Sequence, residues 1–230
     1  MSSRQTIDSK AGRIVDLLEL HYGTPHLADL RGPFEMILWE IVAYLTDDIR
    51  RMAAFEALRN RVGLSAEQIL AAPVELLQEI TRLGGSIAYE SRAHRLHEAS
   101  ALVIEQFDGD LNGILSLPND KALEVLMKFP MTGKPGAEKI LLFCGVRPVL
   151  AVESNGLRAL VRLGFGVDGS NYSKVYQSVR KSIEEELPRD CKFLTRAHQL
   201  LRVHGQEICR RSAPKCHVCP INSECDFFRS

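Results

Sequence analysis

Apolar residues recur along the chain at the spacing of amphipathic helices. Ile14, Leu17 and Leu18 share one face of a helix that we predict over residues 7–23. An almost continuous apolar run predicts a buried helix over residues 33–44. Similar patterns, several of them opened by a capping residue or a proline, predict further helices over residues 48–62, from Ser65 onward, and over residues 73–83, 89–107 and 117–129.

Signals for β-strands are almost absent from the sequence. Residues 149–152, Val-Leu-Ala-Val, form the one compact β-prone run, and so short a run cannot seed a sheet by itself. Residues 24–33 are punctuated by proline and glycine, which predicts a connector between helices. The sequence contains no internal repeat and no low-complexity segment. The predicted fold class is therefore all-α.

The length and composition are those of an ordinary globular protein. A chain of 230 residues can bury one large core or form two closely packed lobes, and 45% of its residues are apolar. No apolar stretch reaches the roughly 18–20 residues that a membrane-spanning helix needs. The first residues also lack the apolar core of a signal peptide. We therefore expect no membrane partner.

Charge is distributed unevenly along the chain, although the net charge is zero. Residues 1–133 carry 13 Lys or Arg and 19 Asp or Glu, a balance of −6. Residues 134–230 carry 16 Lys or Arg and 10 Asp or Glu, a balance of +6. A basic face for a phosphate backbone in the C-terminal part would produce this asymmetry, and so would a solvated mixture of charges without a patch.

Four cysteines lie close together near the C-terminus. They are Cys209, Cys216, Cys219 and Cys225, and their spacing is C-x6-C-x2-C-x5-C. Four thiolates at this spacing can hold a zinc ion or a [4Fe–4S] cluster, and a disulfide-linked tail is the alternative. Cysteines used as metal ligands favour a reducing, cytoplasmic compartment. Cys144 and Cys191 lie outside this run, and we expect them to be buried structural thiols.

A second pattern is a tight turn between two helical stretches. Residues 126–137 read Leu-Met-Lys-Phe-Pro-Met-Thr-Gly-Lys-Pro-Gly-Ala, and the apolar stripe continues after the turn at Ile140 and Leu141. By itself this pattern predicts an ordinary packing unit of two helices. The N–H groups of such a turn and of the following helix N-terminus can also bind a phosphate.

Together, the cysteine run, the helix before it over residues 198–209 and the turn resemble the helix-hairpin-helix DNA glycosylase superfamily, of the endonuclease III and adenine-mismatch glycosylase type. The resemblance implies two helical lobes with the hairpin at the cleft. A central barrel-like lobe would span residues 27–133, and residues 1–26 and 134–230 would form a cluster lobe. It also implies a [4Fe–4S] cluster in the loop formed by residues 209–225.

The resemblance assigns DNA contacts to the hairpin, to one asparagine and to basic residues of the cysteine loop. Pro130 and Gly133 match the superfamily pattern Leu-Pro-Gly-Val-Gly, whereas Met131 stands in place of its first hairpin glycine. Glycine there permits a positive φ and a close approach of the phosphate. The implied DNA-binding residues are Met131, Thr132, Gly133, Lys134, Gly136, Asn155, Arg210, Arg211 and Lys215.

Two carboxylates occupy positions that the resemblance makes catalytic. Glu153 stands at the aspartate that supports the sugar transition state or activates water; it is equally a carboxylate suited to a helix start. Glu40 stands at the glutamate that protonates the leaving base. Its apolar neighbours would raise its pKa by desolvation, unless the side chain lies on an exposed helix face.

Three further positions near these carboxylates differ from the superfamily pattern. Pro135 replaces the lysine that forms a Schiff base in bifunctional members, so β-lyase activity is not expected. Lys139 lies one helical turn after it. Tyr44 and Leu45 replace a Gln-Gln wedge, and either could fill the hole left by a flipped base.

We therefore expect a monomeric, monofunctional DNA glycosylase of base-excision repair. It would hydrolyse the N-glycosidic bond of a damaged or mispaired base in double-stranded DNA. The altered catalytic positions are also what a catalytically reduced relative that binds damaged DNA without cutting it would show. A zinc-stabilised structural module is a third interpretation of the four cysteines.

Overall fold

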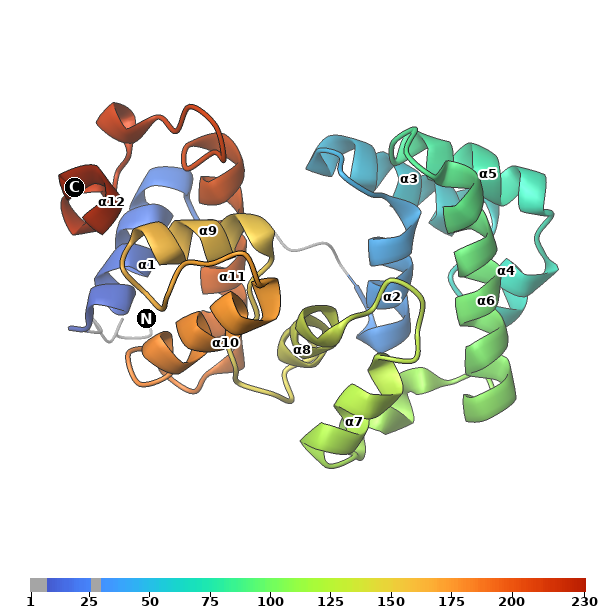
Figure 1. The fold of residues 1–230 in the computed structure, drawn as a ribbon. Helices are drawn as coiled ribbons and strands as arrows, with labels where there is room; N and C mark the ends of the chain where they lie inside the picture. Colours follow the sequence, from blue (N-terminus) through green and yellow to red (C-terminus); the bar gives the residue numbers. More distant parts are fainter. Residues whose placement is uncertain (1–7, 26–29) are drawn as a thin grey trace. The chain divides into compact units, whose positions relative to one another are not determined.

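The computed structural model describes residues 8–25 and 30–230. Every regular element within these residues is a helix, so the predicted all-α class is confirmed (Figure 1). The β-prone run 149–152 lies in irregular chain before a helix. A search of the same residues found no helix that is both long enough and apolar enough to cross a membrane.

The chain divides into two compact units, one within residues 1–26 and 145–230 and the other within residues 27–144. The first predicted boundary between the lobes, at residues 26 and 27, lies outside the described residues. The second boundary is predicted between residues 133 and 134. In the structure, residues 134–144 belong to the second unit, because helix α8 (Lys134–Phe143) packs against helices α2 (Gly32–Val42) and α7 (Asn119–Leu126).

The second unit is built around helix α6 (Tyr89–Phe107), which Figure 1 shows running through its centre. Helices α2, α4 (Ala66–Ala71) and α5 (Val74–Leu83) pack against α6. The unit also contains α3 (Asp48–Arg61), which the sequence predicted, and a 3-10 helix, η1 (Leu111–Ser116). The sequence patterns did not predict η1.

Several helix boundaries follow from local capping chemistry. Asp47 caps α3 by accepting a hydrogen bond from the backbone N–H of Arg50 at 2.8 Å. Ser65 and Gln68 form the reciprocal capping box predicted at the start of α4. Helix α7 ends at Leu126, earlier than predicted, because the chain then turns into the hairpin.

A buried arginine closes one end of the second unit. The Arg92 side chain is fully buried, and its guanidinium donates hydrogen bonds to the backbone carbonyls of Val42, Gly84, Gly85 and Ile87. The hydrogen bond from the guanidinium to the carbonyl oxygen of Val42 is 2.6 Å long. These carbonyls belong to the end of α2, the end of α5 and the loop before α6, so one side chain ties three segments together.

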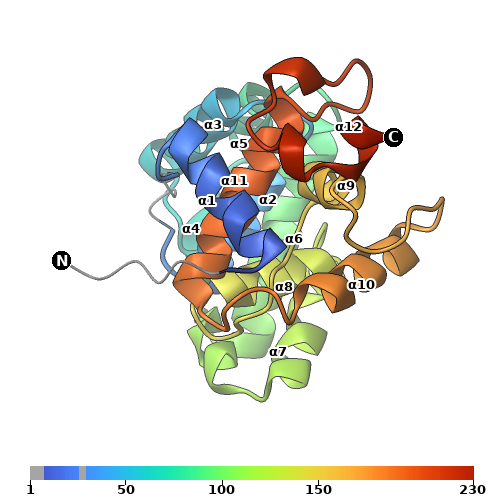
Figure 2. The ribbon, with the colours of Figure 1, turned by 90° about the vertical axis from the view of Figure 1, so that its left-hand side faces the viewer.

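The first unit contains the chain ends and the cysteine loop. Helix α9 (Ser154–Arg162) packs against α11 (Cys191–Glu207), and α11 packs against α1 (Lys10–Tyr22), as Figure 2 shows. Gly205 allows the close approach of α9 and α11: a Cβ there would lie 2.3 Å from the backbone oxygen of Asn155. The other elements of the unit are α10 (Tyr172–Ile183), η2 (Cys216–Val218), η3 (Asn222–Glu224) and α12 (Asp226–Arg229).

Candidate functional site

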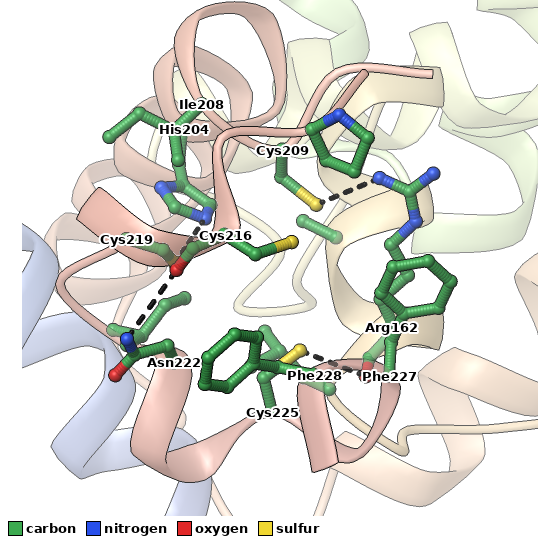
Figure 3. A pocket seen from close by; sticks show the side chains of 14 residues that line it. Arg162, His204, Ile208, Cys209, Cys216, Cys219, Asn222, Cys225, Phe227 and Phe228 are labelled. Atoms are coloured by element: carbon green, nitrogen blue, oxygen red, sulfur yellow. Dashed lines mark hydrogen bonds between the residues drawn. The ribbon is translucent and has the colours of Figure 1, made fainter. Parts of the chain in front are cut away.

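The four cysteines of the C-terminal loop surround one pocket in the first unit. Cys209, Cys216, Cys219 and Cys225 line it together with residues from α9, α11 and α12. All four are free thiols, so the disulfide-linked tail is not what the structure contains. Figure 3 shows the labelled cysteine side chains around an open centre, with aromatic side chains closing one side. The sequence spacing is thus realised as one cluster of thiols.

The sulfur atoms surround the pocket but do not meet at one point. Across residues 8–25 and 30–230, no three His, Cys, Asp or Glu side chains are arranged to hold a metal ion. Burial, the largest cause, raises the pKa of the Cys219 thiol to about 11. A free Cys219 is therefore protonated at neutral pH, and any metal that binds must displace this proton.

Basic and hydrogen-bonding groups approach two of the sulfur atoms. The guanidinium of Arg162 donates to Cys209 Sγ at 3.4 Å, and it also donates to the backbone carbonyls of Arg210 and Arg211. His204 Nε2 lies 3.7 Å from Cys219 Sγ. Burial, with a contribution from a neighbouring histidine, lowers the pKa of His204 to about 4, so its ring is neutral at physiological pH.

The side chains of the basic loop residues are free to face solvent. Arg210, Arg211 and Lys215 are all exposed, and the backbone of Lys215 is fixed by a 2.9 Å hydrogen bond to the carbonyl of Ile208. The loop therefore has an ordered backbone that presents three cations to solvent. This is the arrangement that a phosphate backbone requires.

Glu153 is the N-cap of α9. Its Oε1 accepts a hydrogen bond from the backbone N–H of Gly156 at 2.7 Å, and its Oε2 accepts one from Asn155 Nδ2 at 2.8 Å. Both bonds fix the carboxylate at the positive end of the helix dipole. The helix-start role foreseen from the sequence is thus present. Glu153 also lies near Tyr172, whose pKa is raised by burial and then by the charge of this carboxylate.

A chain of hydrogen bonds connects Glu153 to the cysteine loop. Asn155, which holds Glu153 through its amide nitrogen, accepts a 3.0 Å hydrogen bond from Arg158 through its amide oxygen. Arg158 also donates to the backbone carbonyls of Gly205 at 2.7 Å and Cys209 at 3.0 Å. One arginine therefore links the position of the carboxylate to the first cysteine of the loop.

In the hairpin turn, a methionine and not a glycine adopts the left-handed backbone conformation. Met131 has φ +62°, the conformation that favours glycine, and its side chain is 37% exposed. Thr132 is buried, and its N–H bonds to the carbonyl of Phe129 at 3.1 Å. The turn predicted from the sequence is formed, at a conformational cost of about 1–2 kcal/mol for a non-glycine residue.

Helix α8 begins directly after this turn. Gly133 is its N-cap, with φ −80° and no side-chain cap, and Lys134 and Pro135 form its first positions. Gly133 and Lys134 are exposed, and Gly136 follows in the first turn. The first N–H groups of α8 are therefore open to an anion.

Glu40 has a cationic partner that the sequence did not predict. Its carboxylate lies 2.7 Å from Nζ of Lys139, and their side chains are 32% and 16% exposed. The ion pair joins α2 to the hairpin's second helix, α8. Glu40 is therefore neither a fully solvated charge nor an isolated buried carboxyl. The pair places a positive charge directly beside this carboxylate.

The loop after α2 exposes a group of apolar side chains. Leu45 is 74% exposed and has φ +48°, Tyr44 is 43% exposed, and Ile49 at the start of α3 is 83% exposed. A branched side chain held in a left-handed conformation and directed to solvent is unusual, and such strain often occurs at functional positions. The two residues singled out from the sequence thus lie on a protruding loop.

Sequence patterns missed the residues that hold the candidate side chains in place. Arg158, Lys139 and Tyr172 each contact a candidate residue from a distant part of the chain or another helical turn. An arginine or lysine on an amphipathic helix normally indicates a solvated face, so its sequence context gave no signal. The sequence analysis names Lys139 only for its place one helical turn after Pro135, and His204 lies in the helix before the cysteine run, but the contacts of neither residue were predicted.

Comparisons with known proteins agree with this geometry. No family model matches the chain. Endonuclease III of Rickettsia conorii is 28% identical over 200 residues, which are 86% of this chain and 86% of that protein. Endonuclease III of Escherichia coli is 25% identical over 222 residues, 95% of this chain and 97% of that protein. The fold matches the structure of a non-covalent endonuclease III–DNA complex with a TM-score of 0.74 and 22% identity, covering 100% of this chain and 98% of that one.

The chain is similar to endonuclease III-type DNA glycosylases in sequence and in fold. The similarity extends along almost the whole chain and is not confined to the cysteine loop. The chain nevertheless has its own features at the positions described above. These are the left-handed Met131, the proline at position 135, the Glu40–Lys139 ion pair and the glutamate at position 153.

Proposed function

We propose that this protein is a DNA glycosylase of base-excision repair, which removes a damaged or mispaired base from double-stranded DNA. The observation that carries the proposal is the match with endonuclease III over nearly the full length of both chains. The hydrogen-bonded carboxylate at the start of α9 supports it, since glycosidic hydrolysis requires a fixed negative charge near the sugar. A monomer is sufficient for this activity.

The hairpin and the cysteine loop would hold the phosphate backbone. The open N–H groups at the start of α8, with Thr132, Gly133, Lys134 and Gly136 around them, suit one phosphate. Arg210, Arg211 and Lys215 suit others, and Asn155 and Met131 complete the proposed contact set. Leu45 or Tyr44 would occupy the space left when the target nucleotide leaves the base stack.

Glu153 would act on the sugar. As the bond between C1′ and the base nitrogen breaks, its electron pair leaves with the base and positive charge develops on the sugar. The Glu153 carboxylate would stabilise that charge, orient the water that adds to C1′ and accept the proton that this water loses. The products are the free base and an abasic site. Because its two oxygens are already held by Gly156 and Asn155, the carboxylate needs little reorganisation.

Glu40 would supply the proton for the leaving base. Its carboxylate lies 2.7 Å from Nζ of Lys139. In the proposed step Glu40, protonated from solvent, gives its proton to a nitrogen of the base as the glycosidic bond breaks. Lys139 keeps its own protons, and its positive charge would stabilise the negative charge that returns to Glu40.

We expect no β-lyase step by the superfamily's usual route. Position 135 in the first turn of α8 is a proline, which has no nucleophilic nitrogen to attack C1′. Lys134 is exposed at the helix start, and Lys139 is engaged by Glu40. The proposed enzyme is thus monofunctional: it leaves an intact abasic site.

The cysteine loop fits a [4Fe–4S] cluster. The four residues offer only thiols as donors, all unpaired and all lining one pocket. Four thiolates also suit a zinc ion, and the iron and sulfide content of the purified protein distinguishes the two. When bound, such a cluster is an electron carrier whose potential depends on its surroundings. Cys209, Cys216, Cys219 and Cys225 would hold it, in a reducing compartment inside the cell.

A second candidate function is recognition of damaged DNA without catalysis. Glu40 in an ion pair, proline at position 135 and glutamate at position 153 are the observations that favour it. A protein with this function would bind DNA through the hairpin and the basic loop but would release no base.

The deciding experiment is a base-release screen. Purified protein with measured iron and sulfide content is incubated with duplexes that each carry one lesion or one mismatch. Strand breaks are scored with alkali, which cleaves abasic sites, and without it. We expect alkali-dependent breaks on at least one substrate. We also expect Glu153→Gln to reduce that activity by at least about 100-fold, while the exposed neighbour change Ser154→Ala has little effect.

Other outcomes separate the alternatives. Breaks without alkali would show that lyase activity exists despite Pro135. Tight binding of a damaged duplex with no base release, unaffected by Glu40→Gln and Glu153→Gln, would replace the glycosylase by the binding protein.

A further inference from the structure

A hydrogen-bonded series of three residues runs from helix α1 to one of the proposed cluster ligands. The Tyr22 hydroxyl lies 3.2 Å from Nδ1 of His204, and Nε2 of the same ring lies 3.7 Å from Sγ of Cys219. His204 is 1% exposed, so both ring nitrogens are shielded from water. Tyr22 comes from the N-terminal helix and Cys219 from the C-terminal loop. His204 on α11 connects them.

Metal binding would fix the direction of these hydrogen bonds. A cysteine that ligates iron is a thiolate and has no proton to donate. The contact between His204 and Cys219 then survives only if Nε2 carries the ring proton and donates it to sulfur. In a neutral imidazole Nδ1 is then an acceptor, and the Tyr22 hydroxyl is positioned to donate to it. The thiolate therefore selects the tautomer, and the tyrosine hydroxyl supports it by donating to the nitrogen that carries no proton.

We propose that Tyr22 and His204 form a relay that tunes the reduction potential of the cluster through Cys219. The inference rests on the cofactor assigned under the proposed function. Neither residue contacts DNA or the reacting atoms in this assignment, so both are positioning residues. Hydrogen bonds to cluster sulfur atoms and the groups that orient the donors are established means of setting potentials.

The groups around Cys209 and Cys225 differ from the His204 ring that contacts Cys219. Cys209 accepts from the Arg162 guanidinium, a charged donor. Cys225 Sγ instead lies 3.3 Å from the backbone carbonyl of Arg162, an oxygen that can only accept. His204 is thus a neutral donor whose strength depends on a partner in another helix. Through Tyr22, the position of α1 would influence the electronic state of the loop.

Reduction adds negative charge to the cluster and its sulfur ligands. A donor at Cys219 stabilises the reduced state more than the oxidised state and so raises the potential. Loss of the donor should shift the potential to more negative values. Loss of the tyrosine hydroxyl alone should give a smaller shift in the same direction, because the ring keeps its nitrogen but loses the partner that supports the tautomer.

The experiment compares the wild type with Tyr22→Phe, His204→Phe and a matched control, Asn222→Ala. Asn222 lies in the same loop, and its amide donates to the backbone carbonyl of Cys216 at 3.4 Å, not to sulfur. Iron and sulfide are quantified first for each protein. The midpoint potential is then measured by voltammetry. Pulsed electron paramagnetic resonance of the cluster in a paramagnetic state detects nitrogen coupling from the ring.

We expect the potential to fall most in His204→Phe, less in Tyr22→Phe, and not at all in Asn222→Ala. The nitrogen coupling should vanish in His204→Phe and persist in Tyr22→Phe. Equal potentials in wild type and Tyr22→Phe at equal cluster content would overturn the relay, even if His204→Phe fails to fold. A wild-type protein that binds zinc or no metal would overturn the assigned cofactor and the relay with it. Base release by such a protein would leave the glycosylase proposal standing.

Discussion

Two arginines that bind backbone carbonyls, one taken from each unit, serve different purposes. Arg92 in the second unit binds four backbone carbonyls and no candidate side chain. Arg158 in the first unit binds two carbonyls and also Asn155, the residue that holds Glu153. Burial is the largest cause that lowers the pKa of both guanidinium groups, yet arginine remains charged.

The difference shows how the same side chain can stabilise a fold or organise a site. Arg92 fixes the ends of helices and supports the loop that presents Tyr44 and Leu45, so its loss should affect folding first. Arg158 is less buried and ends a chain of hydrogen bonds that begins at a proposed catalytic carboxylate. Its loss should affect chemistry more than folding.

The largest expected effect is that of Arg92→Met on stability. The change keeps the bulk of the side chain but leaves several buried carbonyls without a donor, and each such group costs about 1–3 kcal/mol. We expect the free energy of unfolding to fall by about 3 kcal/mol or more in chemical denaturation. Arg95→Met, three residues later on α6, is the control and should cost far less. Equal losses for the two variants would show that the carbonyl bonds contribute little.

Arg158→Met should separate the two roles most clearly. We expect base release to fall about 10- to 100-fold, as is common when the support of a functional group is removed. Stability should fall less than in Arg92→Met. The control is Arg202→Met on α11, whose guanidinium bonds to the side chains of Gln199 and Gln206. Unchanged base release in Arg158→Met would mean that Glu153 keeps its position without the chain of hydrogen bonds.

The smallest expected effect concerns the hairpin of the second unit. Met131→Gly relieves the left-handed strain, worth about 1–2 kcal/mol, against about 0.5–1 kcal/mol of extra entropy lost on folding. We expect a net gain in stability of about 0.5–1 kcal/mol in thermal or chemical unfolding. Gly133→Ala is the matched change: Gly133 has φ −80° and open space around it, so stability should stay within about 0.5 kcal/mol.

Duplex binding by the same two variants extends this test. A methyl group at position 133 would stand where the proposed phosphate approaches. Gly133→Ala should therefore weaken binding without lowering stability. A destabilised Met131→Gly would show that the methionine side chain makes contacts that outweigh its backbone strain.

Local patterns predicted most helices because their determinants lie close together in the sequence. The capping box of Ser65 and Gln68 spans three residues, and helix α6 has the predicted bounds Tyr89–Phe107. The cysteine spacing likewise predicted one cluster of thiols. The sequence patterns did not predict the 3-10 helix η1 or the early end of α7, because short turns have weak periodicity.

Candidate residues could be named from the sequence, but their partners could not. The resemblance singled out Glu40 and Glu153 by position. It did not indicate that Lys139 pairs with Glu40 or that Arg158 links Asn155 to Cys209. The sequence left open whether Glu40 is a desolvated carboxyl or lies on an exposed helix face, and the tertiary structure pairs it with a cation.

What the sequence alone determined is the all-α class, the approximate positions of the helices before residue 130 and the set of four thiols, since helical periodicity, capping and ligand spacing act over a few residues. Only the tertiary structure decided which charges are paired and which hydrogen bonds orient the candidate groups. Tyr22 and His204 are 182 residues apart, and Arg158 and Cys209 are 51 apart. Contacts at such separations depend on how whole helices pack, which no local pattern encodes.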